Sequence, residues 1–213
     1  MLVGERMSHP VIALTQDMPV HEALVLFKKE HIRRAPVLKN GQLVGIVSDK
    51  DLLNASPSPV SSLSVWEMNY LLSKITVQEV MTRKVETVQV DTAIEEAARI
   101  MADKKIGGLP VMDGHTVVGV ITETDLFKIF LELMGARANG VRVTALVNDE
   151  RGQLAAITKA IADAGGNFIA FGQFSGTSAN TRMITFKVAG LKMEQVKKAL
   201  EKLTESLLDI REC

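Results

Sequence analysis

GIVSDKDL at residues 45–52 and GVITETDL at residues 119–126 are near copies of each other, and they decide the fold. Residues 7–53 align with residues 81–127 without a gap, at a constant offset of 74 residues. A repeat of this length that occurs only twice is too long for a solenoid unit. It predicts two copies of one small α/β unit packed about a pseudo-twofold axis, with two related clefts that suit a ligand.

The composition is that of an ordinary globular protein, with 213 residues of which 46% are hydrophobic and 23% charged. Acidic and basic residues number 25 each, so no basic field favours nucleic acid or an anionic membrane. The apolar runs are shorter than the ~20 residues of a membrane span, and the N-terminus does not resemble a secretory signal. The lone Cys213 excludes a disulfide or a cysteine-rich metal site within one chain. We therefore expect a cytoplasmic protein.

The same order of elements is expected in both copies. In copy one, about residues 1–56, a helix begins after Asp17 and Pro19, and an Asn-Gly turn joins two strands. In copy two, about residues 75–134, Thr92 and Glu95 have the spacing of a capping box. The expected helices are 20–30, 49–54, 92–103 and 123–134, and the expected strands are 11–14, 35–38, 43–47, 85–88, 109–112 and 117–121.

A proline- and serine-rich loop, residues 55–63, separates the two copies. It leads into an expected linker helix, residues 64–74, where Ser64 and Glu67 have capping-box spacing. Trp66 and Tyr70 of this helix are candidates either for interface anchors or for a cover on the core.

Residues 141–213 match neither copy and follow a plausible linker at residues 135–140. Their pattern predicts the order β-α-β-β-α-β, the ferredoxin-like split unit, with helices on one face of an antiparallel sheet. Phe168, Phe171 and Phe174 are spaced by three, so on a strand they should alternate between faces. The expected strands are 141–147, 167–174, 183–188 and 207–211, the expected helices are 153–164 and 192–203, and the inward residues of the first helix are Leu154, Ile157, Ala160 and Ile161.

A hydroxyl residue and an aspartate recur at matched positions of the two copies, as Ser48 with Asp51 and Thr122 with Asp125. Each pair lies at the predicted start of a helix, where free N–H groups suit a phosphate. The hydroxyl can donate to a phosphate oxygen, and the carboxylate can accept from both hydroxyls of a ribose. The spacing is equally that of a helix N-cap with a first-turn acidic residue, so a purely structural role stays open.

The two stretches resemble the G-h-x-[ST]-x-x-D signature of cystathionine-β-synthase (CBS) domains, and Pro36-Val37 and Pro110-Val111 match the Pro-Val strand of that family. The resemblance covers about residues 1–134 and implies a tandem pair, the Bateman module. It implies binding of AMP, ADP or ATP in the clefts, with S-adenosylmethionine less favoured. Carried over by position, Asp51 and Asp125 would hold ribose, Ser48 and Thr122 would contact phosphate, and the backbone near Ala13 and Thr87 would meet the base.

The copies differ at the residues before the Pro-Val strand. Copy one has Arg33-Arg34, where copy two has Gly107-Gly108. Two arginines can hold a polyphosphate through charge-assisted hydrogen bonds, although a solvated surface pair is the alternative. We expect unequal clefts, with the better nucleotide site being the one that the arginines reach. The sequence leaves open which aspartate shares that cleft.

Residues 141–213 resemble an ACT domain through Asp149-Glu150-Arg151-Gly152-Gln153-Leu154 and Gly166-Asn167. The resemblance implies amino-acid binding near Asp149, Gly152, Leu154 and Asn167, or dimerisation alone. Arg151 stands where that family often has proline, and Gly152 also suits a positive-φ turn.

A CBS pair followed by an ACT domain is similar to AcuB-type acetoin-utilisation proteins of bacteria. This architecture implies a regulatory sensor, a homodimer or homotetramer, and a separate partner enzyme. No catalytic triad, paired-carboxylate site or metal-ligand spacing can be assembled, so we expect no enzyme activity. A ligand-free oligomerisation scaffold is the remaining alternative.

Overall fold

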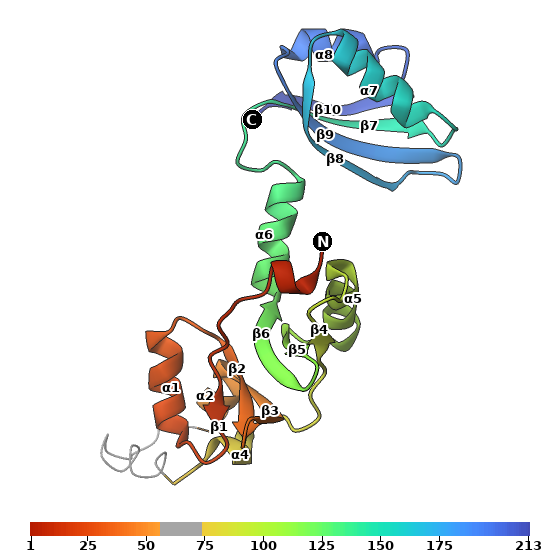
Figure 1. Ribbon diagram of the computed structural model, residues 1–213. Helices are drawn as coiled ribbons and strands as arrows, with labels where there is room; N and C mark the ends of the chain where they lie inside the picture. The colour runs from red at the N-terminus through yellow and green to blue at the C-terminus, as the bar shows by residue number, and fades with distance from the viewer. Residues whose placement is uncertain (56–73) are drawn as a thin grey trace. The chain divides into compact units, whose positions relative to one another are not determined.

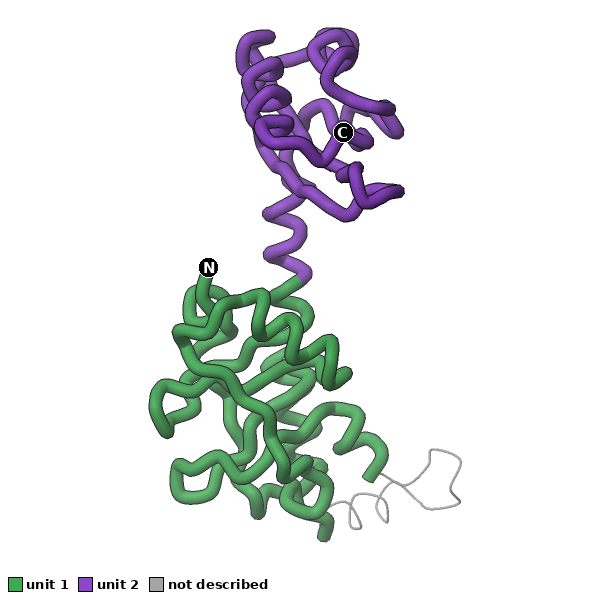
Figure 2. The backbone as a smooth tube through the Cα atoms, turned by 90° about the vertical axis from the view of Figure 1, so that its right-hand side faces the viewer, with its two compact units in different colours: residues 1–126 green, residues 127–213 purple. Residues whose placement is uncertain are grey.

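The computed structural model describes residues 1–55 and 74–213 (Figure 1). The described chain forms two compact units, residues 1–126 and residues 127–213 (Figure 2). The division falls within helix α6 (Glu123–Leu133), so the predicted domain limits of 1–134 and 141–213 stay predictions. The expected linker helix with Ser64, Trp66 and Tyr70 lies mostly outside the described residues.

The two copies fold alike, as the repeat predicts. Each has a three-stranded sheet. Its short first strand pairs in parallel with the middle strand, which forms an antiparallel hairpin with the third. The bulge between Val37 and Leu38 recurs between Val111 and Met112. Copy one contains η1 (Val3–Glu5), β1 (Leu14–Thr15), α1 (Val20–Lys29), β2 (Arg34–Lys39), β3 (Gln42–Ser48) and α2 (Asp49–Asn54). Copy two contains α4 (Val77–Val80), β4 (Val88–Gln89), α5 (Ile94–Lys104), β5 (Gly108–Asp113), β6 (Thr116–Thr122) and α6.

The N-terminal segments of the copies are exchanged. Val3 and Met7 pack in the core of copy two, whereas Val77 and Met81 pack in the core of copy one. Ser8 exchanges two backbone hydrogen bonds with Val120, and Thr82 does the same with Ile46. The methionines fill notches at glycines, because a Cβ at Gly119 would lie 2.4 Å from Met7 Sδ, and one at Gly45 would lie 2.4 Å from Met81 Sδ. Neither core is complete without the other copy.

One helix start differs from the prediction. Helix α5 begins at Ile94 after Ala93, which makes no side-chain cap, so the expected capping box of Thr92 and Glu95 is wrong. The Thr92 hydroxyl instead accepts from the backbone N–H of Gln89 at 3.0 Å and closes the preceding turn. Helix α1 begins at Val20, as predicted, directly after Pro19 and without a side-chain cap.

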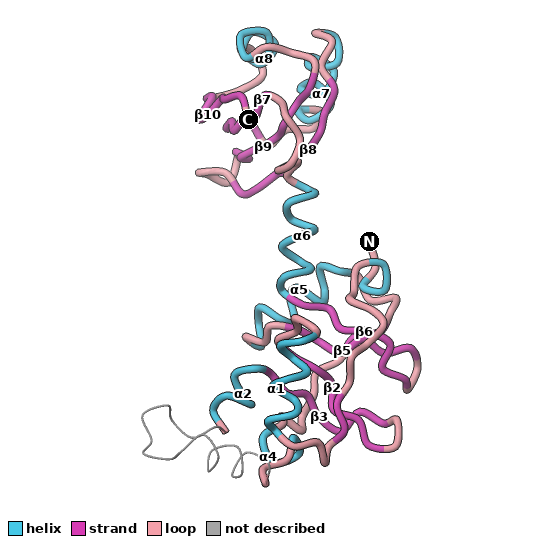
Figure 3. Tube along the Cα trace, turned by 90° about the vertical axis from the view of Figure 1, so that its left-hand side faces the viewer, coloured by secondary structure: helices cyan, strands magenta, loops and turns pink. Residues whose placement is uncertain are grey.

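The second unit has the predicted β-α-β-β-α-β order, with β7 (Val141–Asn148), α7 (Gln153–Asp163), β8 (Asn167–Ser175), β9 (Thr181–Ala189), α8 (Met193–Leu200) and β10 (Ser206–Glu212). The antiparallel sheet has the strand order β10-β7-β9-β8. Helices α7 and α8 lie together on one face of it (Figures 1 and 3). Ile157 and Ile161 of α7 and Val196 of α8 are fully buried in the core between them.

Two expectations about this unit are wrong. The register of β8 shifts between Phe168 and Ala170, and the extra residue returns Phe171 to the same face as Phe168. Both rings therefore pack on Phe186, with centroid separations of 5.3 Å and 6.0 Å, while Phe174 is exposed. Leu154, expected to face inward, lies at the N-terminal end of α7 and is 45% exposed.

The expected linker at residues 135–140 is fixed to the second unit. Lys187 is only 5% exposed, and its ammonium group donates to the carbonyl oxygens of Gly135 and Ala138 at 3.1 and 2.9 Å. Gly140 and Cys213 exchange two backbone hydrogen bonds. The segment therefore moves with the sheet rather than as a free tether.

Candidate functional site

Ser48 and Asp51 form a closed cap at the junction of β3 and α2. The backbone N–H and the hydroxyl of Ser48 both donate to Asp51 Oδ2, at 2.8 and 2.6 Å. The Ser48 oxygen also accepts from the backbone N–H of Asp51 at 3.3 Å. The structural role left open by the sequence is therefore real, and it leaves the second carboxylate oxygen, Oδ1, without a hydrogen bond in the described structure.

Thr122 and Asp125 repeat this geometry where β6 meets α6. Asp125 Oδ2 accepts from the Thr122 backbone N–H at 3.0 Å and from its hydroxyl at 2.7 Å. The surroundings differ, because Asp125 is only 6% exposed, whereas Asp51 is half-buried. The same cap thus presents one carboxylate at a cleft and holds the other in the interior.

Arg34 crosses from copy one to copy two. A Cβ at Gly107 would lie 2.3 Å from an Arg34 guanidinium nitrogen, and one at Gly108 would lie 2.9 Å from Arg34 Cδ. The side chain therefore rests on the backbone of the glycine pair. Burial lowers the pKa of Arg34, while the carboxylates of Glu123 and Asp49 act in the opposite direction. Within residues 1–55 and 74–213 its guanidinium makes no hydrogen bond or close ion pair, so this partly desolvated cation keeps free donors.

Arg34, Ser48 and Asp51 line one cavity of about 170 Å³, which we call the Asp51 cleft. Arg34 therefore shares a cavity with Asp51, and Asp125 does not line that cavity. The other walls come from copy two, namely Thr82, Lys84, Val85, Glu86, Ile106, Gly107 and Gly108, together with Ile46 and Val47 of β3. Lys84 adds a second cation, whereas Glu86 is already bound by Lys104 at 2.6 Å.

The remaining predicted residues lie elsewhere. Arg33 donates to the Thr124 hydroxyl at 3.1 Å, on the first turn of α6 beside Asp125. Thr87 follows the lining residue Glu86 but is not itself in the wall, and Ala13 precedes β1. Sequence reasoning missed Lys84 and Glu86. The repeat offers one sequence signal for them. At the offset of 74 residues Lys84 and Glu86 align with Pro10 and Ile12, so copy two has charged residues where copy one has apolar ones.

The family model of the CBS domain matches residues 3–58 and residues 77–132, together more than half of the chain. The chain belongs to the CBS-domain family. Both copies of the repeat are CBS motifs, and the first unit is a tandem CBS pair. Residues 133–213 lie outside both matches.

Individual relatives agree with this assignment. Protein MJ1426 of Methanocaldococcus jannaschii is 32% identical over 155 residues, which cover 62% of this chain and 92% of that protein. The CBS pair of protein MJ0100, solved in complex with 5′-methylthioadenosine and S-adenosyl-L-methionine, is 29% identical with a TM-score of 0.52 and covers 64% of this chain and 98% of that one. A proposed acetoin utilization protein (AcuB) from Vibrio cholerae is 30% identical with a TM-score of 0.53, over 64% of this chain and 95% of that one.

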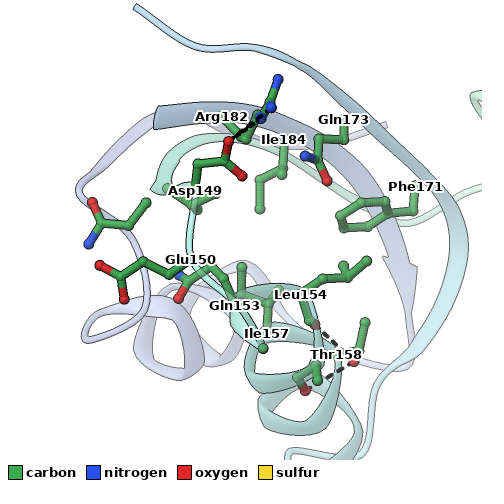
Figure 4. Close-up of a pocket in the computed structure, with 14 residues that line it drawn as sticks. Asp149, Glu150, Gln153, Leu154, Ile157, Thr158, Phe171, Gln173, Arg182 and Ile184 are labelled. Atoms are coloured by element: carbon green, nitrogen blue, oxygen red, sulfur yellow. Dashed lines mark hydrogen bonds and ion pairs between the residues drawn. The ribbon is translucent and has the colours of Figure 1, made fainter. Parts of the chain in front are cut away.

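A second cavity, of about 550 Å³, lies within the second unit at the start of α7, and we call it the α7 cavity (Figure 4). One rim carries an ion pair, in which Arg182 Nε donates to Asp149 Oδ2 at 2.9 Å. Leu154, Ile157 and Phe171 form apolar walls facing it. Three of the predicted residues, Asp149, Gly152 and Leu154, line this cavity, but Asn167 does not. Arg182 was missed because it lies on β9, far from the turn in sequence.

Gly152 takes φ +87° as the N-terminal flanking residue of α7, where no side chain caps the helix. The first turn of α7 thus has no side-chain cap, and its residues Gln153 and Leu154 line the α7 cavity, where the positive end of the helix dipole suits an anionic group. Among the described residues no three or more His, Cys, Asp or Glu side chains group as a metal site. Over the same residues no helix combines the length and apolarity needed to cross a bilayer.

Proposed function

We propose that the CBS pair is a non-enzymatic sensor that binds an adenine nucleotide in the Asp51 cleft. The observation that carries the proposal is the unpartnered, half-buried guanidinium of Arg34 in the same cavity as Asp51. An anionic group is the natural partner for such a cation, and arginine binds phosphate through two parallel hydrogen bonds. The adenosine ligands of the MJ0100 pair support the ligand class.

Roles for individual residues follow from the hydrogen bonds. Asp51 Oδ1 would accept from the ribose hydroxyls, because Oδ2 is occupied by Ser48. Arg34 and Lys84 would hold phosphate. The cavity is smaller than the roughly 300–1,000 Å³ of typical ligand sites, so the ligand would displace the Arg34 side chain from the glycine pair. A phosphate contact by Ser48 and base contacts near Ala13 and Thr87 stay predictions.

The second cleft, with Thr122 and Asp125, is proposed as the weaker site. Asp125 is buried, and Arg33 is bound to Thr124 beside it. A ribose would therefore have to displace existing contacts to reach this carboxylate. Unequal affinity of the two sites for one ligand follows.

The test is thermal unfolding of the full chain with AMP, ADP, ATP, S-adenosylmethionine and 5′-methylthioadenosine. A ligand at 100 times its dissociation constant stabilises the folded state by about 2.7 kcal/mol. For a chain of this size that raises the midpoint by roughly 5–10 °C. A rise with the phosphorylated adenylates supports the proposal. No rise with any of the five ligands contradicts it and favours the ligand-free scaffold.

For the second unit we propose an ACT domain that binds an amino acid in the α7 cavity. One observation favours this ligand class. The rim of the cavity carries a negative group, Asp149, and two positive ones, Arg182 and the uncapped start of α7, while its walls are apolar. That combination suits a zwitterion with an apolar side chain. Isothermal titration with an amino-acid panel, on the full chain and on Leu154→Lys, tests it. Binding by neither protein would leave dimerisation as the role of this unit.

At the level of the assembly we propose a homodimer or homotetramer that regulates a separate metabolic enzyme, as in the AcuB-type architecture. Regulation requires that the nucleotide bind two conformational states with different affinity. Small-angle scattering of the chain with and without ATP is the direct check, since identical profiles at saturation would remove the basis for a global switch.

A further inference from the structure

Glu123 lies beside the Asp51 cleft and is not used by the proposed nucleotide site. It stands on the first turn of α6, and its backbone N–H donates to the carbonyl oxygen of Gly107 at 3.2 Å. The residue is exposed and does not line the cavity itself. Within residues 1–55 and 74–213 its carboxylate makes no hydrogen bond and no close ion pair. An acidic group with free acceptors thus lies next to one wall of the cleft.

The carboxylate of Glu123 and the guanidinium of Arg34 reach the same point above Gly107. A Cβ at Gly107 would lie 2.9 Å from Arg34 Nη1 and also 2.9 Å from Glu123 Oε2. Among the charged neighbours of Arg34, Glu123 has the largest effect on its pKa, which it raises. The glycine leaves room for both groups at one place, because it carries no side chain. A small movement of either side chain would therefore join the two charges.

The other carboxylates near Arg34 are already engaged within their own helix. Asp49, which aligns with Glu123 at the offset of 74 residues, accepts from the backbone N–H of Lys50 at 2.8 Å. Asp51 Oδ2 accepts from Ser48. Glu123 is thus the acidic neighbour of Arg34 whose carboxylate oxygens both stay free within the described part of the chain.

We propose that Glu123 is a specificity-determining residue of the Asp51 cleft, which competes with the phosphate groups of a ligand for Arg34. The proposal rests on the proposed nucleotide site and gives that site a preference among ligands. A phosphate that approaches Arg34 must draw the guanidinium away from Glu123 and accept repulsion from the carboxylate, and this cost grows with the charge of the ligand. An adenosine ligand without phosphate bears no such cost. The MJ0100 pair holds two ligands of that kind, 5′-methylthioadenosine and S-adenosyl-L-methionine.

The first experiment is isothermal titration of the full chain and of Glu123→Gln with adenosine, 5′-methylthioadenosine, AMP and ATP. Exposed charges interact weakly, so we expect Glu123→Gln to bind ATP about threefold to fivefold more tightly and AMP about twofold more tightly. Adenosine and 5′-methylthioadenosine should bind as they do to the wild type. A gain that increases with the number of phosphates is the result that a purely structural role of Glu123 would not produce.

Glu95→Gln is the matched control. Glu95 is an exposed residue on the first turn of α5, so this variant also removes one negative charge from a helix start in copy two. It does not line the Asp51 cleft. We expect it to bind all four ligands as the wild type does. An equal gain in ATP affinity in both variants would show an effect of net charge alone and would overturn the role of Glu123.

The second experiment repeats the ATP titration in the Arg34→Gln background. If Glu123 competes for Arg34, the gain from Glu123→Gln should fall by at least half once the arginine is absent, because there is no longer a cation to compete for. A gain of the same size in both backgrounds would mean that the carboxylate repels phosphate directly, and it would overturn the competition.

The outcomes separate this inference from the function on which it rests. A wild-type chain that binds ATP no more weakly than Glu123→Gln does overturns the role of Glu123 and keeps the nucleotide site. A gain of equal size for adenosine and ATP overturns it as well, since the substitution would then have reshaped the cleft. A wild-type chain and variants that bind none of the four ligands overturn both proposals.

Discussion

The two CBS copies share a framework and differ in what they do with it. In the hairpin of copy one, Arg34 lies opposite Ser48. At the equivalent positions of copy two, Gly108 lies opposite Thr122. Both aspartates hold the preceding hydroxyl and N–H in the same way. Yet only copy one has an arginine at this position. Its Arg34 side chain rests on Gly107 and Gly108 of copy two, which are the residues that align with Arg33 and Arg34. A duplicated fold can therefore yield one well-equipped cleft through a change at a single dipeptide.

The largest effect is expected when copy two is given the arginine of copy one. Gly108 is buried, and a Cβ there would lie 2.9 Å from the Ile121 carbonyl oxygen as well as from Arg34. Gly108→Arg should lower the free energy of unfolding by about 3 kcal/mol, because overpacked cores must shift backbone. Urea unfolding measures this. Ala102→Arg, on the exposed face of α5, is the control and should stay within about 0.5 kcal/mol of the wild type; equal stability of both variants would contradict the close packing.

The next effect compares the two aspartates. Asp51→Ala should weaken ATP binding about ten- to hundredfold, because a bound ribose loses a charged acceptor. Asp125→Ala should change ATP affinity less than the first substitution does, but it should lower the free energy of unfolding by about 1 kcal/mol, since Thr122 loses its capping partner. Isothermal titration and thermal unfolding measure the two effects. Equal losses of affinity would mean that the clefts are equivalent.

A smaller effect separates the neighbouring arginines. Arg34→Gln should weaken ATP binding about tenfold while leaving adenosine binding unchanged, since only the phosphate contact is removed. Arg33→Gln is the matched control, because Arg33 is bound to Thr124 and does not line the Asp51 cleft. If adenosine and ATP lose affinity alike in Arg34→Gln, the residue supports the cleft and does not bind phosphate.

The smallest effect concerns the segments that begin each copy. Thr76 and Leu2 both donate a backbone N–H to a glutamate three residues on, but only Thr76 adds a hydroxyl bond, at 2.8 Å. The backbone and side-chain hydrogen bonds from Thr76 lower the pKa of Glu79. The stabilisation by ionised Glu79 is thus present above its unfolded pKa of about 4.3 and is lost as the pH falls through the folded value.

Thr76→Leu should move the pKa of Glu79 up, toward its ordinary value, so this stabilisation is lost at a higher pH. Carboxyl NMR titration gives the pKa directly. Glu86 is the internal reference, because its pKa is lowered by the hydrogen bond from Lys104 and not by Thr76. An unchanged Glu79 titration would show that the Thr76 hydroxyl contributes nothing.

Most of the fold could be predicted from local sequence patterns, because the interactions behind them join residues that are close in sequence. The repeat and the Asn-Gly hairpin were predicted correctly, and the cap that Ser48 forms with Asp51 was one of the two roles left open for that pair. Thr92 has the same spacing as a capping box, but its hydroxyl found a nearer partner in Gln89. The bulge in β8 also escaped prediction, since one extra residue reverses every face assignment after it.

The candidate site was predictable in residue type but not in arrangement. The importance of Arg33-Arg34 could be read from their contrast with Gly107-Gly108, whereas their opposite destinations could not. Arg34 lies on the glycine pair and Arg33 on Thr124 because of how the copies pack, and that packing uses contacts far apart in sequence. The same reason hid Lys84 from the Asp51 cleft and Arg182 from the α7 cavity.

The exchange of Met7 and Met81 between the copies has a consequence for separating them. A single copy on its own would expose its methionine and leave the notch at its strand glycine empty, because Met7 fills the notch at Gly119 and Met81 the notch at Gly45. The core of each copy therefore needs a residue of the other copy, and cutting the chain between the copies would leave two incomplete cores.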